Sequence, residues 1–243
     1  MHAVIMAGGK GTRLRPYTTA LPKPLVPIGD SHAILEVVLH QLSAYGFTSA
    51  TLAINHLGQL IRAFVGDGSR WGIEVDYVEE HVPLSTIGPL FGLRDRLPEH
   101  FLVMNGDVLT DLDYSDLLHA HAMSDAPLTV ATARRTVHID FGVLDVSDDT
   151  IVGFREKPEI PATVSMGIYL FEPEAVDYIT KGSAMDLPEL IDLLLGDGHL
   201  VAGYPFDGYW LDIGRHSDYQ QAIDDFERMR AHLLPEPPLR AAS

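Results

Sequence analysis

The sequence contains no cysteine, few basic residues and no long apolar run, and each shortage excludes a class of function. Without cysteine, disulfides and thiolate metal sites are both excluded, which fits a reducing compartment. The chain has 17 Lys and Arg residues against 34 Asp and Glu, and this net charge of −17 argues against non-specific binding to nucleic acid or to an anionic membrane. No stretch approaches the ~20 apolar residues that a membrane span needs. We therefore expect a cytoplasmic protein with neither nucleic-acid nor membrane partners.

Nothing in the composition divides the chain into separate domains. It has 243 residues, of which 46% are hydrophobic, and this is enough to bury one sizeable core. No Pro/Gly/Ser-rich or charge-rich stretch interrupts residues 1–234, whereas residues 235–243 have no core-forming pattern. The start, MHAVIMAGG, has neither the basic segment nor the apolar run of a signal peptide. We expect a single domain over residues 1–234 and a flexible tail over residues 235–243.

Strand and helix patterns alternate through the first half of the chain. Short apolar runs predict strands, and apolar residues at helical spacing predict helices. The strands are expected at residues 2–6, 50–54, 73–78, 101–104 and 128–133, and the helices at residues 34–45, 59–65, 89–97 and 114–123. Such alternation is typical of an α/β fold with a doubly wound, mostly parallel sheet and helices on both faces.

The second half of the chain is less regular. Residues 141–146 and 151–154 indicate a short antiparallel excursion with a turn at residues 147–149, which makes the fold mixed rather than purely parallel. Further strands are expected at residues 166–171 and 200–204, and helices at residues 173–180, 187–195 and 217–233.

A glycine-rich, basic segment, GGKGTRLRP at residues 8–16, follows the first expected strand. In an open parallel sheet, ligands bind at the carboxyl ends of the strands, where this segment would lie. Glycines let the backbone approach a phosphate closely, and Arg13 can add planar, charge-assisted hydrogen bonds. The spacing matches neither a dinucleotide-binding fingerprint nor a P-loop. We interpret the segment as a phosphate site rather than a chance cluster of solvated charges.

Lys23 stands between two prolines, Pro22 and Pro24. The prolines restrict the backbone on both sides, so the ammonium group is held in a narrower range of positions. A rigid surface turn would explain this segment on its own. The glycine-rich segment upstream favours a functional lysine.

Asp107 ends a very apolar strand in the segment FLVMNGD, residues 101–107. It would project from the carboxyl edge of the sheet, the edge at which the glycine-rich segment lies. Mg²⁺ binds one or two carboxylates together with phosphate oxygens and waters. Asp107 is therefore a candidate magnesium ligand, and a turn-capping role is the structural alternative.

These segments together resemble the signature of the sugar-1-phosphate nucleotidyltransferases, in particular the mannose-1-phosphate guanylyltransferase-like and glucose-1-phosphate thymidylyltransferase-like enzymes. The resemblance rests on GGxGTRLxP at residues 8–16 followed by PKPL at residues 22–25. It implies a Rossmann-like nucleotide-diphospho-sugar transferase fold, with Lys23 at the reacting phosphates. The residues that it implies for nucleotide binding are Gly8, Gly9, Gly11, Thr12, Arg13 and Gly106.

The same resemblance supplies a second metal ligand. Residues 209–214, YWLDIG, resemble the Trp-x-Asp-x-Gly element of the family, whose aspartate binds the metal. The resemblance implies that Asp107 and Asp212 bracket one Mg²⁺ between the α-phosphate and the sugar phosphate. The candidate catalytic residues are then Arg13, Lys23 and Asp107.

Two further segments resemble the sugar-binding elements of the family. FREKP at residues 154–158 resembles the Glu-Lys-Pro element, which implies that Glu156 accepts hydrogen bonds from sugar hydroxyls and that Lys157 binds the sugar 1-phosphate. SMGIY at residues 165–169 stands where the family has Asn-Ala-Gly-Ile-Tyr, and Gly167 would let the sugar lie close to the backbone. The two departures in this segment leave the identity of the sugar open.

The expected base-recognition loop also departs from the family pattern. It reads PLSTIG at residues 83–88, with Ser85 in place of the usual glycine. Glu80 lies just upstream, and its carboxylate, which only accepts hydrogen bonds, suits the two donors on the guanine edge. This favours GTP, although Glu79 or Glu80 would serve equally as a solvated strand end.

The sequence thus predicts a Mg²⁺-dependent enzyme that couples a nucleoside triphosphate, GTP by preference, with a sugar 1-phosphate or sugar-like 1-phosphate, and releases pyrophosphate. The same reaction with dTTP, UTP or CTP is the nearest alternative. A catalytically silent nucleotide-sugar sensor and a glycosyltransferase are the alternatives from other classes. The sensor would be expected to lack Arg13, Lys23 or an aspartate, and none is missing. A homo-oligomer is compatible with the sequence but is not indicated by any one patch.

Overall fold

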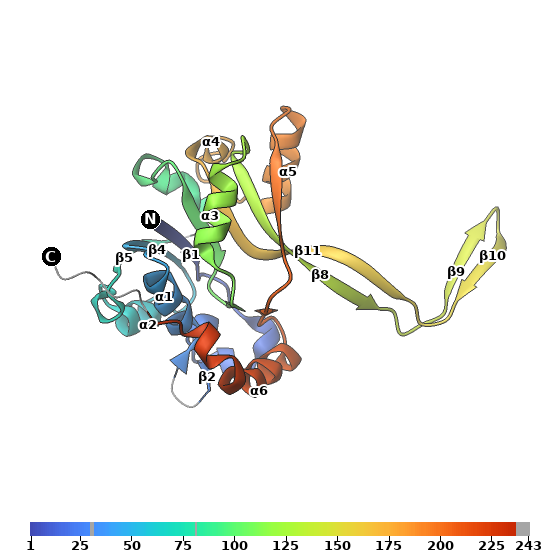
Figure 1. The fold of residues 1–243 in the computed structure, drawn as a ribbon, viewed down its shortest axis with the longest axis horizontal. Coiled ribbons are helices and arrows are strands. Elements are labelled where there is room, and N and C mark those ends of the chain that lie inside the picture. Colours follow the sequence, from blue (N-terminus) through green and yellow to red (C-terminus); the bar gives the residue numbers. More distant parts are fainter. Residues whose placement is uncertain (30–31, 81, 237–243) are drawn as a thin grey trace.

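A mixed sheet of seven strands organises the fold (Figure 1). The computed structural model describes residues 1–29, 32–80 and 82–236. The strands of this sheet are β1 (His2–Met6), β4 (Ser49–Ile54), β5 (Glu74–Glu79), β6 (Phe101–Asn105), β8 (Leu128–His138), β11 (Glu159–Phe171) and β12 (Val201–Phe206). Their spatial order is β12–β8–β11–β6–β1–β4–β5, and each neighbouring pair is parallel except the two that involve β11. The mostly parallel, mixed sheet expected from the sequence is confirmed.

Helices cover both faces of the sheet, because side chains along each strand alternate between two cores. In β1, Ala3 and Ile5 belong to one core and Val4 to the other. The helices that contribute to the first core are α1 (Ile34–Ala44), α2 (Gly58–Val65) and α3 (Tyr114–Ala122). Those that contribute to the second are η5 (Gly88–Arg96), α4 (Pro173–Val176) and α5 (Leu187–Gly196). The doubly wound arrangement is therefore also confirmed.

Two expected helices differ from the prediction. The helix expected at residues 89–97 is the 3₁₀ helix η5, and it contains Gly92, which disfavours α-helix. The helix expected at residues 173–180 is α4, which ends at Val176 after one turn. In both places, packing of Leu90, Leu93 and Val176 into the second core fixes the segment without a regular α-helix.

The expected antiparallel excursion is the tip of a much longer arm (Figure 1). β8 and β11 continue to pair beyond the sheet, as far as His138 opposite Glu159. The hairpin of β9 (Val143–Ser147) and β10 (Thr150–Arg155) follows, and its two-residue turn, Asp148-Asp149, has φ values of 45° and 61°. Positive φ at both turn residues is what a tight hairpin of this kind requires. Residues 134–163, hereafter the arm, project from the body of the molecule.

A third core lies beside the sheet and joins distant parts of the chain. The long helix α6 (His216–Leu233) packs there against two small ribbons, one of β2 (Pro27–Ile28) with β3 (His32–Ala33) and one of β7 (Val108–Thr110) with β13 (Trp210–Asp212). The buried residues of this core are Leu14, Val26, Ile28, Ile34, Val37, Leu109, Leu211, Ile213, Tyr219, Ala222, Phe226 and Leu233. The segments that were expected to carry function are therefore tied to the C-terminal helix.

The described part of the chain contains no helix that is both long and apolar enough to cross a membrane. Residues 237–243 lie outside the described residues, so the tail expected at 235–243 stays a prediction. The expectation of a single domain over residues 1–234 also stays a prediction.

Replacing Phe226 by alanine should lower the free energy of unfolding by about 3–5 kcal/mol, because the ring is fully buried in the third core and its loss leaves a cavity. Urea denaturation followed by circular dichroism measures this change. Ile223→Ala on the same helix is the matched control, since that side chain is 37% exposed and should cost roughly 1 kcal/mol. Equal losses for the two variants would contradict the third core.

Candidate functional site

A cavity of about 500 Å³ lies at the carboxyl ends of β1, β4 and β6. Parallel pairing brings these strand ends to one edge of the sheet. The lining residues follow the strands or come from two loops: Met6, Ala7, Gly8, Gly9, Lys10, Lys23, Pro24, Asn55, Glu80, Pro83, Ser85, Thr86, Asn105 and Asp107. Six of the predicted site residues are among them, namely Gly8, Gly9, Lys23, Glu80, Ser85 and Asp107.

The glycine loop presents bare backbone to the cavity. A β-carbon on Gly8 would lie only 3.1 Å from the Cβ atom of Asn55 and 3.2 Å from Oε1 of Glu80, so the loop passes close to the neighbouring strand ends. A β-carbon on Gly9 would meet nothing within 4 Å. Backbone that is exposed in this way can approach a phosphate closely, as the sequence predicted.

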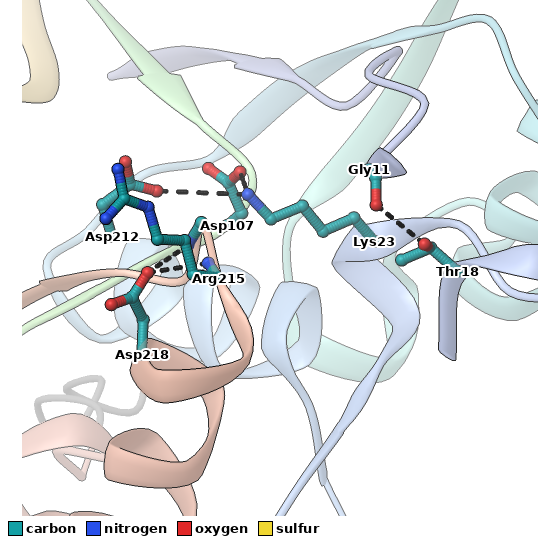
Figure 2. Close-up of polar contacts among 8 residues, drawn as sticks. Gly11, Thr18, Lys23, Asp107, Asp212, Arg215 and Asp218 are labelled. Atoms are coloured by element: carbon teal, nitrogen blue, oxygen red, sulfur yellow. Dashed lines mark hydrogen bonds and ion pairs between the residues drawn. The ribbon is translucent and has the colours of Figure 1, made fainter. Parts of the chain in front are cut away.

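Beyond the cavity, the chain turns through Gly11, whose φ is 59°. The carbonyl oxygen of Gly11 accepts a 2.7 Å hydrogen bond from the Thr18 hydroxyl (Figure 2). Thr12 and Arg13 then enter the 3₁₀ turn η1 (Thr12–Leu14). These three predicted nucleotide-binding residues follow the cavity-lining segment in sequence but do not themselves line the cavity.

Lys23 forms ion pairs with both predicted metal ligands (Figure 2). It begins the 3₁₀ turn η3 (Lys23–Leu25), with Pro22 before it and Pro24 after it, and is buried to 9% exposure. Its Nζ atom forms an ion pair with Oδ2 of Asp107 and lies 4.0 Å from Oδ1 of Asp212. The expectation that the flanking prolines aim this ammonium group into the site therefore agrees with its position.

The surroundings of the two carboxylates differ, and both leave room for interaction with a cation. Oδ1 of Asp107 is buried and has no hydrogen-bond partner among the described residues. Partial burial and the nearby charge of Asp107 raise the pKa of Asp212 above its usual value, against the opposing effects of Lys23 and Arg13. A buried, unsatisfied carboxylate oxygen next to a second carboxylate is a donor set that Mg²⁺ accepts.

The small ribbon of β7 and β13 brings the two aspartates together. Asp212 stands opposite Val108 in that ribbon, and the Ile213 amide donates a 3.2 Å hydrogen bond to the carbonyl oxygen of Asp107. Residues 107 and 212 are far apart in sequence, so only this pairing makes one site of them.

The loop that follows Asp212 is fixed from the start of α6. Oδ2 of Asp218 accepts hydrogen bonds from the amides of Gly214 and Arg215, at 3.1 and 2.7 Å (Figure 2). A β-carbon on Gly214 would lie 3.7 Å from the guanidinium group of Arg13. Arg13 therefore lies against the loop that follows Asp212, where its charge favours the ionised form of Asp212.

Two more predicted glycines lie where the chain is tightly packed. The amide of Gly106 donates a 3.0 Å hydrogen bond to the Met6 carbonyl oxygen, which holds the tip of β6 against β1. Gly167 has a φ of 74°, and a β-carbon there would lie 2.6 Å from the amide nitrogen of the Asn105 side chain. Gly167 therefore leaves space for Asn105, which lines the cavity.

Glu80 lies at the end of β5, on the cavity wall. Its Oε2 atom accepts a 3.0 Å hydrogen bond from the Leu84 amide, whereas Oε1 faces Gly8. Burial raises the pKa of this carboxyl group above its usual value. Glu80 thus both holds the base-recognition loop and offers an oxygen at the cavity, while Glu79 is exposed and does not line it.

Ser85 adopts a conformation that glycine would adopt more easily, with a φ of 64°. Asp186 stabilises this loop: its Oδ1 atom accepts a 2.5 Å hydrogen bond from the Ser85 hydroxyl, a 3.2 Å bond from the Thr86 amide, and a further bond from the Thr86 hydroxyl. The hydrogen bonds from Ser85 and Thr86 hold the pKa of Asp186 below its usual value. The position predicted for base recognition is therefore clamped by a residue 101 positions away.

The structure does not bring Glu156 and Lys157 to the cavity. Both are exposed, and they connect β10 to β11 within the arm (Figure 1). No described residue of the arm, 134–163, lines the cavity. In this structure the predicted sugar-phosphate residues and the predicted nucleotide residues are thus in different places.

Several cavity residues were not among the predicted site residues. Asn55 follows β4, and the carboxyl-end rule that identified Asp107 would have found it too. Asn105, at the end of β6, could have been found in the same way. Thr86 and Pro83 line the cavity through the irregular loop after β5, for which periodicity gives no signal.

Comparison with known proteins supports the resemblance seen in the motifs. A family profile described as nucleotidyl transferase matches residues 2–228. The chain is 34% identical to the mannose-1-phosphate guanylyltransferase of Mycobacterium tuberculosis over 99% of this chain and 67% of that protein. It is also 34% identical to the UTP–glucose-1-phosphate uridylyltransferase of Synechocystis over 92% of this chain and 62% of that protein.

A solved structure gives the same picture of the fold. HddC from Yersinia pseudotuberculosis, complexed with GMP-PN, superposes with a TM-score of 0.70 at 25% identity, and the match covers 93% of this chain and 99% of HddC. The curated relatives are longer, since this chain spans 62–67% of their length. The profile match over most of the chain confirms the family expected from the motifs.

Proposed function

We propose that this chain, which belongs to the nucleotidyl transferase family, joins a nucleoside monophosphate from a nucleoside triphosphate to a sugar 1-phosphate and releases pyrophosphate. The observation that carries this proposal is the meeting of Lys23, Asp107 and Asp212 beside a cavity lined by Gly8 and Gly9. The names of the relatives, which describe guanylyl and uridylyl transfer to sugar 1-phosphates, support the same reaction. A cytoplasmic location, where nucleoside triphosphates are available, fits this role.

The chemistry requires orientation and charge neutralisation more than proton transfer. A phosphate monoester oxygen is already a competent nucleophile, so attack on the α-phosphorus needs no general base. The enzyme must align that oxygen with the leaving pyrophosphate and stabilise the negative charge on the reacting phosphorus. The glycine loop binds the triphosphate through its backbone, Lys23 contacts the reacting phosphates, and Arg13 adds positive charge next to them.

Asp107 and Asp212 are the residues that would hold Mg²⁺. The unpartnered Oδ1 atom of Asp107 fits a metal ligand, and the second carboxylate completes an oxygen donor set of the kind Mg²⁺ prefers. When bound, the ion would polarise phosphoryl oxygens and offset their charge. Lys23 offsets part of the negative charge of the two carboxylates.

The proposed preference for the guanine base rests on the carboxylate of Glu80. Guanine offers two adjacent donors, N1–H and the 2-amino group, and a carboxylate oxygen can accept from both. Oε1 of Glu80 faces the cavity, and Oε2 is held by the Leu84 amide. HddC was solved with GMP-PN, and the M. tuberculosis relative is named as a guanylyltransferase, which also favours GTP. We therefore propose GTP as the preferred nucleotide.

The arm carries the residues proposed to bind the sugar phosphate, and it also exposes much apolar surface. Its exposed large hydrophobic residues are Val137, Phe141, Leu144, Val146, Ile151, Val152, Phe154 and Ile160. So many exposed large hydrophobic residues on one segment favour an interaction site there. We propose that the arm docks on a second copy of the chain in a symmetric dimer.

In such a dimer, the arm of one protomer would bring Glu156 and Lys157 to the cavity of its partner. The long pairing of β8 with β11 makes the arm a continuous ribbon that leads away from the body of the molecule (Figure 1). The cavity is lined by Lys10 and Lys23 but by no cation of the arm. A second chain would supply the cation that a sugar 1-phosphate requires.

Asp107→Asn should lower kcat for pyrophosphate release by about 10³-fold, because metal ligation at the reacting phosphates is worth several kcal/mol. The assay uses GTP and a panel of sugar 1-phosphates at saturating Mg²⁺, with circular dichroism to check the fold. The matched control is Asp116→Asn, an exposed carboxylate on α3 that should leave kcat unchanged. Near wild-type turnover by Asp107→Asn would exclude this metal assignment.

Glu80→Gln should lower the ratio of kcat/KM for GTP to that for dTTP by about 10–100-fold, because the single amide oxygen of glutamine is needed to accept from the Leu84 amide, which leaves an NH2 donor facing the two guanine donors. Parallel assays with GTP, dTTP, UTP and CTP measure the ratio. The neighbouring Glu79→Gln is the control, since Glu79 is exposed and outside the cavity. An unchanged ratio in Glu80→Gln would remove the basis for choosing GTP.

Mixing two defective variants tests the proposed role of the arm. Lys157→Ala should raise KM for the sugar 1-phosphate without raising KM for GTP, and Asp107→Asn should be inactive. Mixed dimers of the two would contain one intact site, so an equimolar mixture should recover about a quarter of wild-type activity.

Differently tagged chains, co-expressed and purified through both tags, ensure that mixed dimers are present. Failure of those dimers to recover activity would show that the arm does not serve the partner's site. Phe141→Ser with Phe154→Ser should convert the dimer to a monomer in size-exclusion chromatography with light scattering. If the wild-type chain is itself monomeric at micromolar concentration, the dimer proposal is wrong.

A further inference from the structure

A second group of metal-ligating side chains lies at the opposite end of β6 from the cavity. His100 immediately precedes β6, and Glu172 immediately follows β11. The two strands are antiparallel and pair Phe101 with Phe171, so His100 and Glu172 lie side by side. Because β6 has five residues, this group is about 17 Å from the catalytic edge.

The third member of the group, His121, comes from α3 and is fully buried. Its Nδ1 atom lies 2.7 Å from the hydroxyl oxygen of Thr129 on β8. Its Nε2 atom is buried and has no hydrogen-bond partner among the described residues. When Nδ1–H donates to Thr129, Nε2 carries a free lone pair with a fixed direction, as in metal-binding histidines.

His100 has a similar unpaired atom. Its Nδ1 atom lies 3.7 Å from Oε1 of Glu172, beyond hydrogen-bond distance, and is buried without a partner in the described structure. The rings of His100 and His121 meet edge to face, with centroids 5.2 Å apart. Aromatic packing explains this ring contact but leaves two buried nitrogens unsatisfied, which native proteins rarely tolerate.

We propose that His100, His121 and Glu172 form a binding site for Zn²⁺. One ligand atom from each residue lies within 4.8 Å of the other two. Tetrahedral Zn²⁺ with bonds of about 2.0–2.1 Å requires ligand separations of about 3.3 Å, which small side-chain rotations would reach. Two imidazoles and one carboxylate suit Zn²⁺, whereas Mg²⁺ prefers oxygen donors alone.

A metal at this position would act on the fold rather than on the proposed reaction. It would connect α3, which supplies His121, with the ends of β6 and β11, while Thr129 of β8 orients the His121 ring. The side chains of His100 and Glu172 are each 30% exposed, so the ion can enter from solvent and a water can occupy the fourth position.

Zn²⁺ titration of the full chain tests the site. The parent for the titration is Asp107→Asn with Asp212→Asn, so that the catalytic carboxylates cannot bind the ion. After treatment with a chelator, calorimetry should find one equivalent of bound Zn²⁺, and the melting temperature should rise with Zn²⁺ concentration. Adding His100→Ala should weaken Zn²⁺ binding by more than about 100-fold, and Thr129→Val by about 10–100-fold.

His138→Ala is the matched control, because His138 pairs with Glu159 on the arm at 3.3 Å and belongs to no group of three ligands among the described residues. It should leave Zn²⁺ affinity unchanged. Co²⁺ supplies a spectroscopic readout, since its visible absorption should appear in the parent and disappear with His100→Ala. The absence of an equivalent of Zn²⁺ in the parent, or equal affinity in the parent and His100→Ala, would overturn the proposal.

Discussion

The contact of one buried ammonium group with two carboxylates is the constraint on which the rest of the site depends. The negative charges of Asp107 and Asp212 repel each other. Lys23 is buried, and leaving its charge without a carboxylate partner would cost free energy. The backbone must therefore hold three segments in fixed positions. Pro22 and Pro24 stiffen the lysine segment, and the ribbon of β7 and β13 joins the two aspartates.

The third core supplies that rigidity. In the short strand β13 and the residue after it, Leu211 and Ile213 are buried in this core, and the residue between them, Asp212, points outward to the site. α6 covers the same core and, through Asp218, binds the loop after Asp212. The C-terminal helix is therefore part of the catalytic framework, although none of its residues lines the cavity. The packing of α6 against Leu211 and Ile213 therefore stabilises the segment that carries Asp212.

Sequence patterns could predict those strands and site residues whose signal comes from residues next to one another in the chain. The apolar runs of β1 and β6 and the glycine segment after β1 indicated the carboxyl edge, and with it Gly8, Gly9 and Asp107. The prolines on either side singled out Lys23, and its place at the reacting phosphates followed from the resemblance. β7 and β13 have only three residues each, which is too short for a periodic signal, so the partner of Asp107 followed from resemblance alone. The length of the arm was underestimated because residues 134–138 are all exposed, whereas the alternating pattern that predicts a strand depends on one buried face.

Ser85 shows how a local departure from a family pattern is balanced elsewhere in the fold. A left-handed conformation costs a non-glycine residue about 1 kcal/mol, and Asp186 offsets this cost by accepting hydrogen bonds from Ser85 and Thr86. The Ser85 hydroxyl donates its proton to Asp186, so it has none left to donate to a base. Glu80 holds the other side of the same loop through Leu84 and keeps an oxygen at the cavity. The proposed discrimination among bases therefore falls to Glu80, while Ser85 fixes the shape of the loop next to it.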